Sequence, residues 1–190
     1  GIGESGFFIG WESNGQDGTL SSLYGRYVPL SGAPTAELSL AVTTAGEQTG
    51  LAFAPLADGG AACFWSTDGK IAGGLVDESG SPAGWEKDVA SAGDGTLVEP
   101  RAVAIEQETV AVVYEHRKGG FRDVLGRVVG AYDGSWQLGE EQALAAEELL
   151  FETSPVIARS GDYVYVAWVE QDVTTTACVR RFDLQLGNPS

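Results

Sequence analysis

Few residues in this chain of 190 have a type and spacing that could support catalysis. His116 is the only histidine, so any serine–histidine–aspartate triad must use it. It lies in the basic segment YEHRKGGFRD, and no serine stands in a G-x-S-x-G nucleophile elbow. We therefore expect His116 to be an exposed loop residue, and we assign no catalytic residue. Because the 27 acidic residues are too many for an acid/base pair to be selected, glycosidase chemistry stays open.

Three arginines, Arg26, Arg127 and Arg180, occupy corresponding places in similar segments, where a fourth segment has Gly74. Converging arginines could clamp a carboxylate. However, recurrence at equivalent positions is what a structural role predicts, such as pairing with a neighbouring acid or stacking on an aromatic ring. We favour the structural interpretation.

One loop has the donors that a hard cation requires. Glu12, Asn14 and Asp17 alternate with glycines in ESNGQDG, and such oxygen ligands suit calcium. The loop lacks an acidic first position and the bidentate glutamate of an EF-hand, whereas Asn-Gly and Asp-Gly are typical of hairpin turns. We interpret it as a turn, with calcium as the alternative, and expect no other cofactor and no metal site.

The elements that carry these residues form an internal repeat. An aromatic residue ends an apolar run at Trp11, Trp65, Tyr114 and Trp168, at intervals of about 54, 49 and 54 residues. Such a period is typical of one four-stranded propeller blade. The runs VAVVY and YVYVAW are apolar at every position, which indicates strands buried on both faces. We expect these aromatics to pack in the core between blades.

The repeat predicts an all-β fold, a β-propeller-like array of four-stranded antiparallel blades. The approximate repeats are 1–50, 51–99, 100–154 and 155–190, which gives three, four, four and three strands, or about three and a half to four blades. We expect one repeat domain over 1–190, part of a larger propeller that another protein chain or a missing segment completes. The segment EEQALAAEELLF is expected as an edge strand, with a short helix as the alternative.

Composition limits the partners. The formal net charge of −16 repels phosphates and anionic lipids, so nucleic acid is not expected as a partner. No apolar run approaches the length of about 20 residues that spans a bilayer, so no membrane insertion is expected. Cys63 and Cys178 are expected as free thiols, with a disulfide as the alternative. The chain has no methionine and opens within a strand pattern, so we expect a processed or trimmed product.

The first repeat resembles one found in large secreted bacterial proteins. In those repeats an apolar strand ends in W-x-S, followed by a GQDG-type loop and a strand of Y-x-R-Y-D character. The resemblance covers residues 6–66 best and returns in SPVIARSGDYVYVAWVE and CVRRFDLQLGNP, but it thins in the two middle copies. It implies a propeller-like arrangement, export and an extracellular or cell-surface setting, and it implies no reaction.

These observations favour a non-enzymatic binding or structural module, for adhesion or assembly, of an exported bacterial protein. The alternatives are a fragment of a sialidase-like propeller glycosidase and a propeller lectin. A lectin would bind carbohydrate through aromatic rings in polar, turn-rich segments, and Trp85 and Trp136 are the candidates. The segment Ser66-Thr67-Asp68-Gly69-Lys70 only begins to resemble a sialidase Asp box, because no tryptophan follows it.

Overall fold

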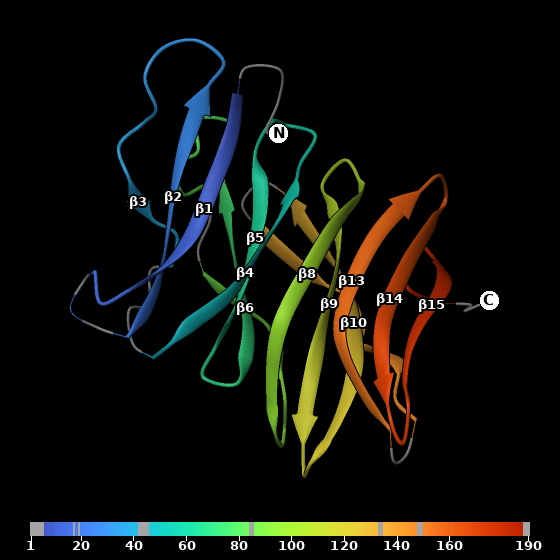
Figure 1. Cartoon of the computed structure of the whole chain (residues 1–190). Helices are drawn as coiled ribbons and strands as arrows, with labels where there is room; N and C mark the ends of the chain where they lie inside the picture. The colour runs from blue at the N-terminus through green and yellow to red at the C-terminus, as the bar shows by residue number, and fades with distance from the viewer. Residues whose placement is uncertain are drawn as a thin grey trace.

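The computed structural model describes residues 6–16, 18, 20–41, 46–83, 86–132, 135–147 and 150–187, with the side chains of 131–132 excepted. Every regular element in these residues is a β-strand, which confirms the all-β prediction. The strands form successive layers along the chain (Figure 1). The first layer consists of β1 (Gly6–Asn14), β2 (Ser21–Pro29) and the short β3 (Leu38–Ser39).

The second layer is a four-stranded antiparallel sheet. It contains β4 (Gln48–Pro55), β5 (Ala61–Thr67), β6 (Lys70–Val76) and β7 (Lys87–Ser91) in chain order. The turn between β5 and β6 consists of Asp68 and Gly69, with φ of 47° and 75°. Positive φ at both central residues is the geometry of a two-residue hairpin, so the segment that begins to resemble an Asp box forms a tight turn.

The remaining strands form one eight-stranded sheet with two antiparallel halves. The third layer contains β8 (Thr96–Glu106), β9 (Thr109–Lys118) and β10 (Phe121–Tyr132), and both β11 (Ser135–Leu138) and β12 (Gln142–Ala145) pair with β10. The fourth layer contains β13 (Phe151–Ser160), β14 (Tyr163–Gln171) and β15 (Thr175–Asp183). Among the described residues, the pair Arg122–Phe151 alone joins the halves. Residues 142–145 form an edge strand, as expected, and not a helix.

The cross-strand register aligns the four aromatic residues, which we call the anchors. Trp11 pairs with Tyr24, Trp65 with Ala72, Tyr114 with Leu125, and Trp168 with Cys178. In each layer, the residue two positions before the anchor pairs with the recurring arginine position. These pairs are Ile9–Arg26, Cys63–Gly74, Val112–Arg127 and Val166–Arg180. Directly opposed residues share a face of a sheet. Each layer therefore has an anchor face, which carries these residues, and a back face.

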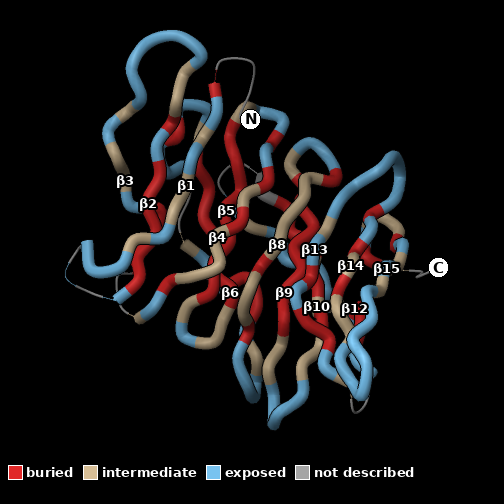
Figure 2. The backbone as a smooth tube through the Cα atoms, viewed as in Figure 1, coloured by how far each residue is buried: buried red, intermediate tan, exposed pale blue. Residues whose placement is uncertain are grey.

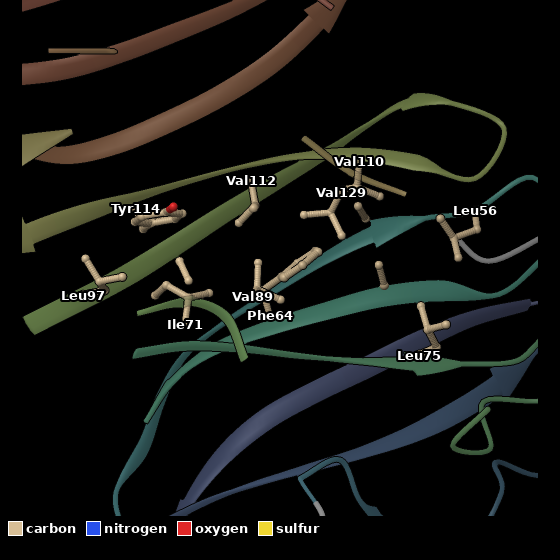
Figure 3. Packing of buried hydrophobic residues seen from close by; sticks show 13 residues of the cluster. Leu56, Phe64, Ile71, Leu75, Val89, Leu97, Val110, Val112, Tyr114 and Val129 are labelled. Carbon is tan, nitrogen blue, oxygen red and sulfur yellow. The ribbon is translucent and has the colours of Figure 1, made fainter. Parts of the chain in front are cut away.

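The core lies between successive layers. Each of three buried clusters joins the back face of one layer to the anchor face of the next. Between the second and third layers, Phe64, Ile71 and Val89 pack against Val112 and Tyr114 (Figure 3). Near-continuous apolar runs are therefore required in β5 and β9, since both faces of these strands are covered.

The two outermost faces are covered by no described layer. In β1, at one end of the array, exposed residues alternate with partly buried ones, and in β15, at the other end, most residues are exposed (Figure 2). Large apolar side chains on these outer layers include Ile9, 47% exposed, and Val179, 68% exposed. The described layers form an open array, and the sheets do not close on one another.

Candidate functional site

The leading strands of the second, third and fourth layers, β4, β8 and β13, lie beside one another (Figure 1). Residues of all three strands line a groove. Two hollows follow it. One, of about 530 Å³, is lined by Glu12, Phe53, Arg101 and Val156 among others. The other, of about 740 Å³, lies toward the opposite ends of the strands and includes the 104–109 segment and Arg159.

Two arginines, Arg101 and Arg159, lie in the groove among the glutamates Glu12, Glu106 and Glu108. Arg101 donates from Nη1 to the carbonyl of Pro100 at 2.8 Å, and Arg159 donates from Nε to the carbonyl of Gly161 at 3.0 Å. Both bonds use backbone acceptors, so the guanidinium charges are not neutralised by these contacts. A polar or anionic ligand could therefore be held in the groove by charge-assisted hydrogen bonds.

The carboxylate in the smaller hollow is engaged in a backbone contact. Glu12 Oε1 accepts from the amide of Gly50 at 2.6 Å and from that of Leu51 at 3.4 Å. Gly50 has a φ of 71° and lies at a register shift in β4. A glycine is suited to this bulge because it adopts positive φ without steric cost.

The same arrangement recurs in the other leading strands. Glu99 in β8 and Ser154 in β13 also have positive φ, 54° and 55°, at register shifts. Glu115, which follows the anchor Tyr114 as Glu12 follows Trp11, accepts from the amide of Ser154 at 3.3 Å. We call this contact the bulge clasp. It fixes β4 and β13 to the layer before each of them and so shapes the groove.

The three recurring arginines do not converge on one point. Arg127 donates to the carbonyl of Val89 in β7 at 2.8 Å and Arg180 to that of Leu144 in β12 at 3.0 Å, so each reaches the last strand of the preceding layer. Arg180 also lies over the ring of Trp168, at 5.3 Å from its centroid. Arg26 lies 3.7 Å from Glu37. These contacts support the structural interpretation of the arginines over a carboxylate clamp.

Three of the four anchors are buried as predicted. Trp65, Tyr114 and Trp168 are at most 3% exposed. Trp11 is half-buried and stacks on Tyr24, with 6.5 Å between the two ring centroids. Trp11 differs because its anchor face has no described layer against it.

Two other aromatic predictions have different outcomes. Trp136 packs edge-on against Phe64, with ring centroids 5.9 Å apart, so its ring belongs to the core rather than to a sugar-binding surface. Trp85 lies outside the described residues, and its contact with carbohydrate stays a prediction.

The prediction that His116 is an exposed loop residue is wrong. His116 lies within β9, its side chain is 13% exposed, and its Nε2 is 2.8 Å from the carbonyl oxygen of Asp94. The basic residues beside it form ion pairs, Lys118 with Asp94 and Arg117 with Glu99 and Glu115. The basic segment is thus a hairpin held by acidic partners.

The remaining candidates are the thiols and the calcium loop. Cys63 and Cys178 are free, and burial raises the pKa of the Cys63 thiol well above its ordinary value, as expected for an unreactive core thiol. Among the described residues, no three His, Cys, Asp or Glu side chains cluster as metal ligands. Asp17 lies outside the described residues, so calcium binding by this loop stays a prediction.

A buried carboxylate in β13 has an unusual environment. Glu152 is fully buried, its Oε1 accepts from the amide of Glu147 at 3.0 Å, and its Oε2 has no partner in the described structure. Burial raises the pKa of Glu152 to about 6, and the nearby charges of Asp123 and Glu170 act in the same direction. The charged form is therefore disfavoured in the fold.

A pH-dependent stability follows from Glu152. Because the pKa of Glu152 is raised in the folded state, this carboxyl group favours folding most below about pH 4.5. Its favourable contribution to the free energy of unfolding is lost as the pH rises to about 6. Glu152→Gln should therefore raise the free energy of unfolding above pH 6 by about 1 kcal/mol. Urea unfolding at several pH values measures this, with the exposed Glu106→Gln as the matched control. An equal effect of both variants at every pH would contradict the prediction.

Comparisons with known proteins give a fold and no family. No protein-family model matches the chain, and no curated protein sequence matches it. Solved structures with a similar fold include a protein titled "Glycoside hydrolase", with a TM-score of 0.60, 9% identity, and coverage of 98% of this chain and 45% of that one. Another is GH43B of a xyloglucan locus of Bacteroides ovatus, with a TM-score of 0.58, 11% identity, and coverage of 98% and 40%.

A third similar structure is the K499G mutant of NanB sialidase from Streptococcus pneumoniae. Its TM-score is 0.54 at 15% identity, and the match covers 77% of this chain and 24% of that one. The chain thus spans less than half the length of these structures. At such identities the likeness shows the fold alone, which is β-propeller-like and all-β.

Proposed function

We propose that this chain is a non-enzymatic binding or structural module of an exported bacterial protein, in which further β-sheets complete a propeller. The observation that carries the proposal is the repeated interface, where every anchor face that a neighbouring layer covers is buried and the outermost faces are left open. The side chains that recur between layers serve packing. Arg127 and Arg180 bond to neighbouring carbonyls, and Glu12 and Glu115 hold bulge amides.

In the proposed assembly, the groove along β4, β8 and β13 faces the propeller axis. Arg101 and Arg159 would be its polar contacts for a ligand, which includes carbohydrate as a candidate. The export and cell-surface setting rests on the resemblance of the first repeat to secreted bacterial proteins.

A fragment of a propeller glycosidase is the second candidate, because the similar solved structures are glycoside hydrolases. Glycoside hydrolysis requires two carboxyl groups on opposite sides of the scissile bond. In the groove, Glu12 is engaged by two amides, while Glu106 and Glu108 lie at the other end, at the β8–β9 turn.

One assay separates the two candidates. The chain is incubated with aryl xylosides, arabinosides and sialosides, and its binding to a glycan array is measured in parallel. We expect no release of the aryl group above the uncatalysed rate, with any glycan signal reduced by Arg101→Ala. Release that is abolished in Glu106→Gln or Glu108→Gln would establish the glycosidase instead.

A further inference from the structure

We propose that two copies of this chain associate head to tail, with the anchor face of the first layer docked on the back face of the fourth layer of the second copy. This inference rests on the proposed function, in which further β-sheets cover the open ends, and it identifies the covering sheet. The first layer presents an apolar surface that includes Phe7, Ile9 and Trp11, and Phe7 and Ile9 are 41% and 47% exposed.

The opposite end of the array presents the complementary kind of face. On the back face of the fourth layer, Val156 and Val179 are 53% and 68% exposed, and Tyr163 and Tyr165 are 42% and 37% exposed. Arg181 lies over the Tyr163 ring at 4.3 Å from its centroid, which holds that ring in place on the surface. Exposed apolar patches of this kind mark interaction sites on soluble proteins.

The chain itself shows how such faces combine. Three times within it, a back face meets the anchor face of the following layer and forms a buried apolar cluster. The two exposed faces are one of each class. A second copy of this chain carries a back face for the exposed anchor face and an anchor face for the exposed back face. An unrelated partner would be complementary to only one of the two faces.

Arg26 adds a polar requirement to the anchor face. Its counterparts Arg127 and Arg180 each donate to a backbone carbonyl of the preceding layer, but Arg26 has no described layer before it. In the fourth layer, β15 pairs only with β14 among the described strands, so no described strand continues the layer beyond the outer edge of β15. We infer that Arg26 bonds to this edge across the interface.

The association is heterologous, because two different surfaces meet. Such contacts close into a ring when the rotation permits, and otherwise they extend into filaments. The net charge of −16 on each copy opposes the approach, so the association should strengthen as added salt screens the repulsion.

A mixing experiment tests the pairing. Ile9→Asp disables the anchor face and Val179→Asp disables the back face, and each is expected to weaken self-association at least about tenfold in sedimentation velocity. Mixed in equal amounts, the two variants retain one intact interface and should form a dimer and nothing larger. Val173→Asp is the matched control, because Val173 is 92% exposed in the turn between β14 and β15, away from both faces.

The outcomes are distinct. Closed rings or longer oligomers of the unmodified chain, together with a dimer in the mixture, support the proposal. A chain that is monomeric at all concentrations and salt levels overturns it, as does a mixture that stays monomeric while the unmodified chain associates. Neither result affects the glycan-binding and hydrolysis assays, which test the proposed function separately. Far-UV circular dichroism and the urea midpoint show whether each variant is folded.

Discussion

Trp65→Ala is expected to lower the free energy of unfolding by about 3–5 kcal/mol, whereas Trp11→Ala should lower it by about 1 kcal/mol or less. The two residues occupy the same position in the repeat and pair with β6 and β2 in the same register. Trp65 is fully buried between the first and second layers, where Leu23, Leu40 and Ala72 surround it. Trp11 lies on the open anchor face, so its removal leaves no enclosed cavity.

Urea unfolding followed by circular dichroism measures both losses. The measurement is made in the Ile9→Asp background, so that self-association does not add to the stability of either protein. Trp65→Phe is a useful intermediate, because the Trp65 Nε1 is buried with no hydrogen-bond partner in the described structure. Phenylalanine keeps an aromatic ring without this unpaired donor, so we expect a loss smaller than that of alanine. Equal losses of unfolding free energy in Trp11→Ala and Trp65→Ala would show that the anchor face of the first layer is already covered.

The contrast between these tryptophans shows what periodicity could and could not predict. Four aromatics at a period of about 50 residues predicted equivalent strands, and the cross-strand register aligns them. Apolar character at every position predicted burial on both faces of the runs VAVVY and YVYVAW. The structure confirms this for VAVVY in β9. For YVYVAW in β14 the prediction is wrong, because Tyr163 and Tyr165 are 42% and 37% exposed on the back face that no described layer covers. Exposure of Trp11 depends on the absence of a described neighbouring layer, and local sequence contains no such information.

The bulge clasp was missed for a different reason. Its donor and acceptor lie 38 residues apart for Glu12 and Gly50 and 39 apart for Glu115 and Ser154, on different hairpins. A signal was present, since an acidic residue follows two of the anchors, and proline follows the bulge residue in EP and SP. Recognising it required knowing that each leading strand lies beside the preceding layer.

The wrong prediction for His116 and the choice of Trp136 as a sugar-binding candidate have one origin. Both rested on polar neighbours in the sequence, but both residues lie in strands. The cationic side chains of the basic segment form ion pairs with acidic residues. The Trp136 ring packs against Phe64 of the preceding layer. Local polarity indicates which residues one strand brings to the surface, whereas burial in this fold is determined by the adjacent layer. The same limit prevented the groove arginines Arg101 and Arg159 from being selected among the charged residues.

Glu115→Ala is expected to lower the free energy of unfolding by about 2–4 kcal/mol, because it removes a buried carboxylate that holds three groups together. Glu115 is 1% exposed. Its Oε1 accepts from Arg117 Nε at 2.5 Å and lies 3.4 Å from Arg122 Nη1, and its Oε2 accepts from the amide of Ser154. Alanine would leave that amide without its acceptor at a bulge that already requires a positive φ.

The repeat supplies the matched control for this prediction. Glu12 makes the equivalent bulge clasp to Gly50 but is exposed, so water can replace its carboxylate and Glu12→Ala should cost about 1 kcal/mol or less. Glu115→Gln separates charge from hydrogen bonding, because the amide oxygen can still accept from Ser154 while the ion pairs are lost. We expect Glu115→Gln to lower the free energy of unfolding by less than Glu115→Ala does. Urea midpoints for Glu115→Ala and Glu12→Ala that shift equally would show that neither burial nor the ion pairs with Arg117 and Arg122 strengthen the bulge clasp of Glu115.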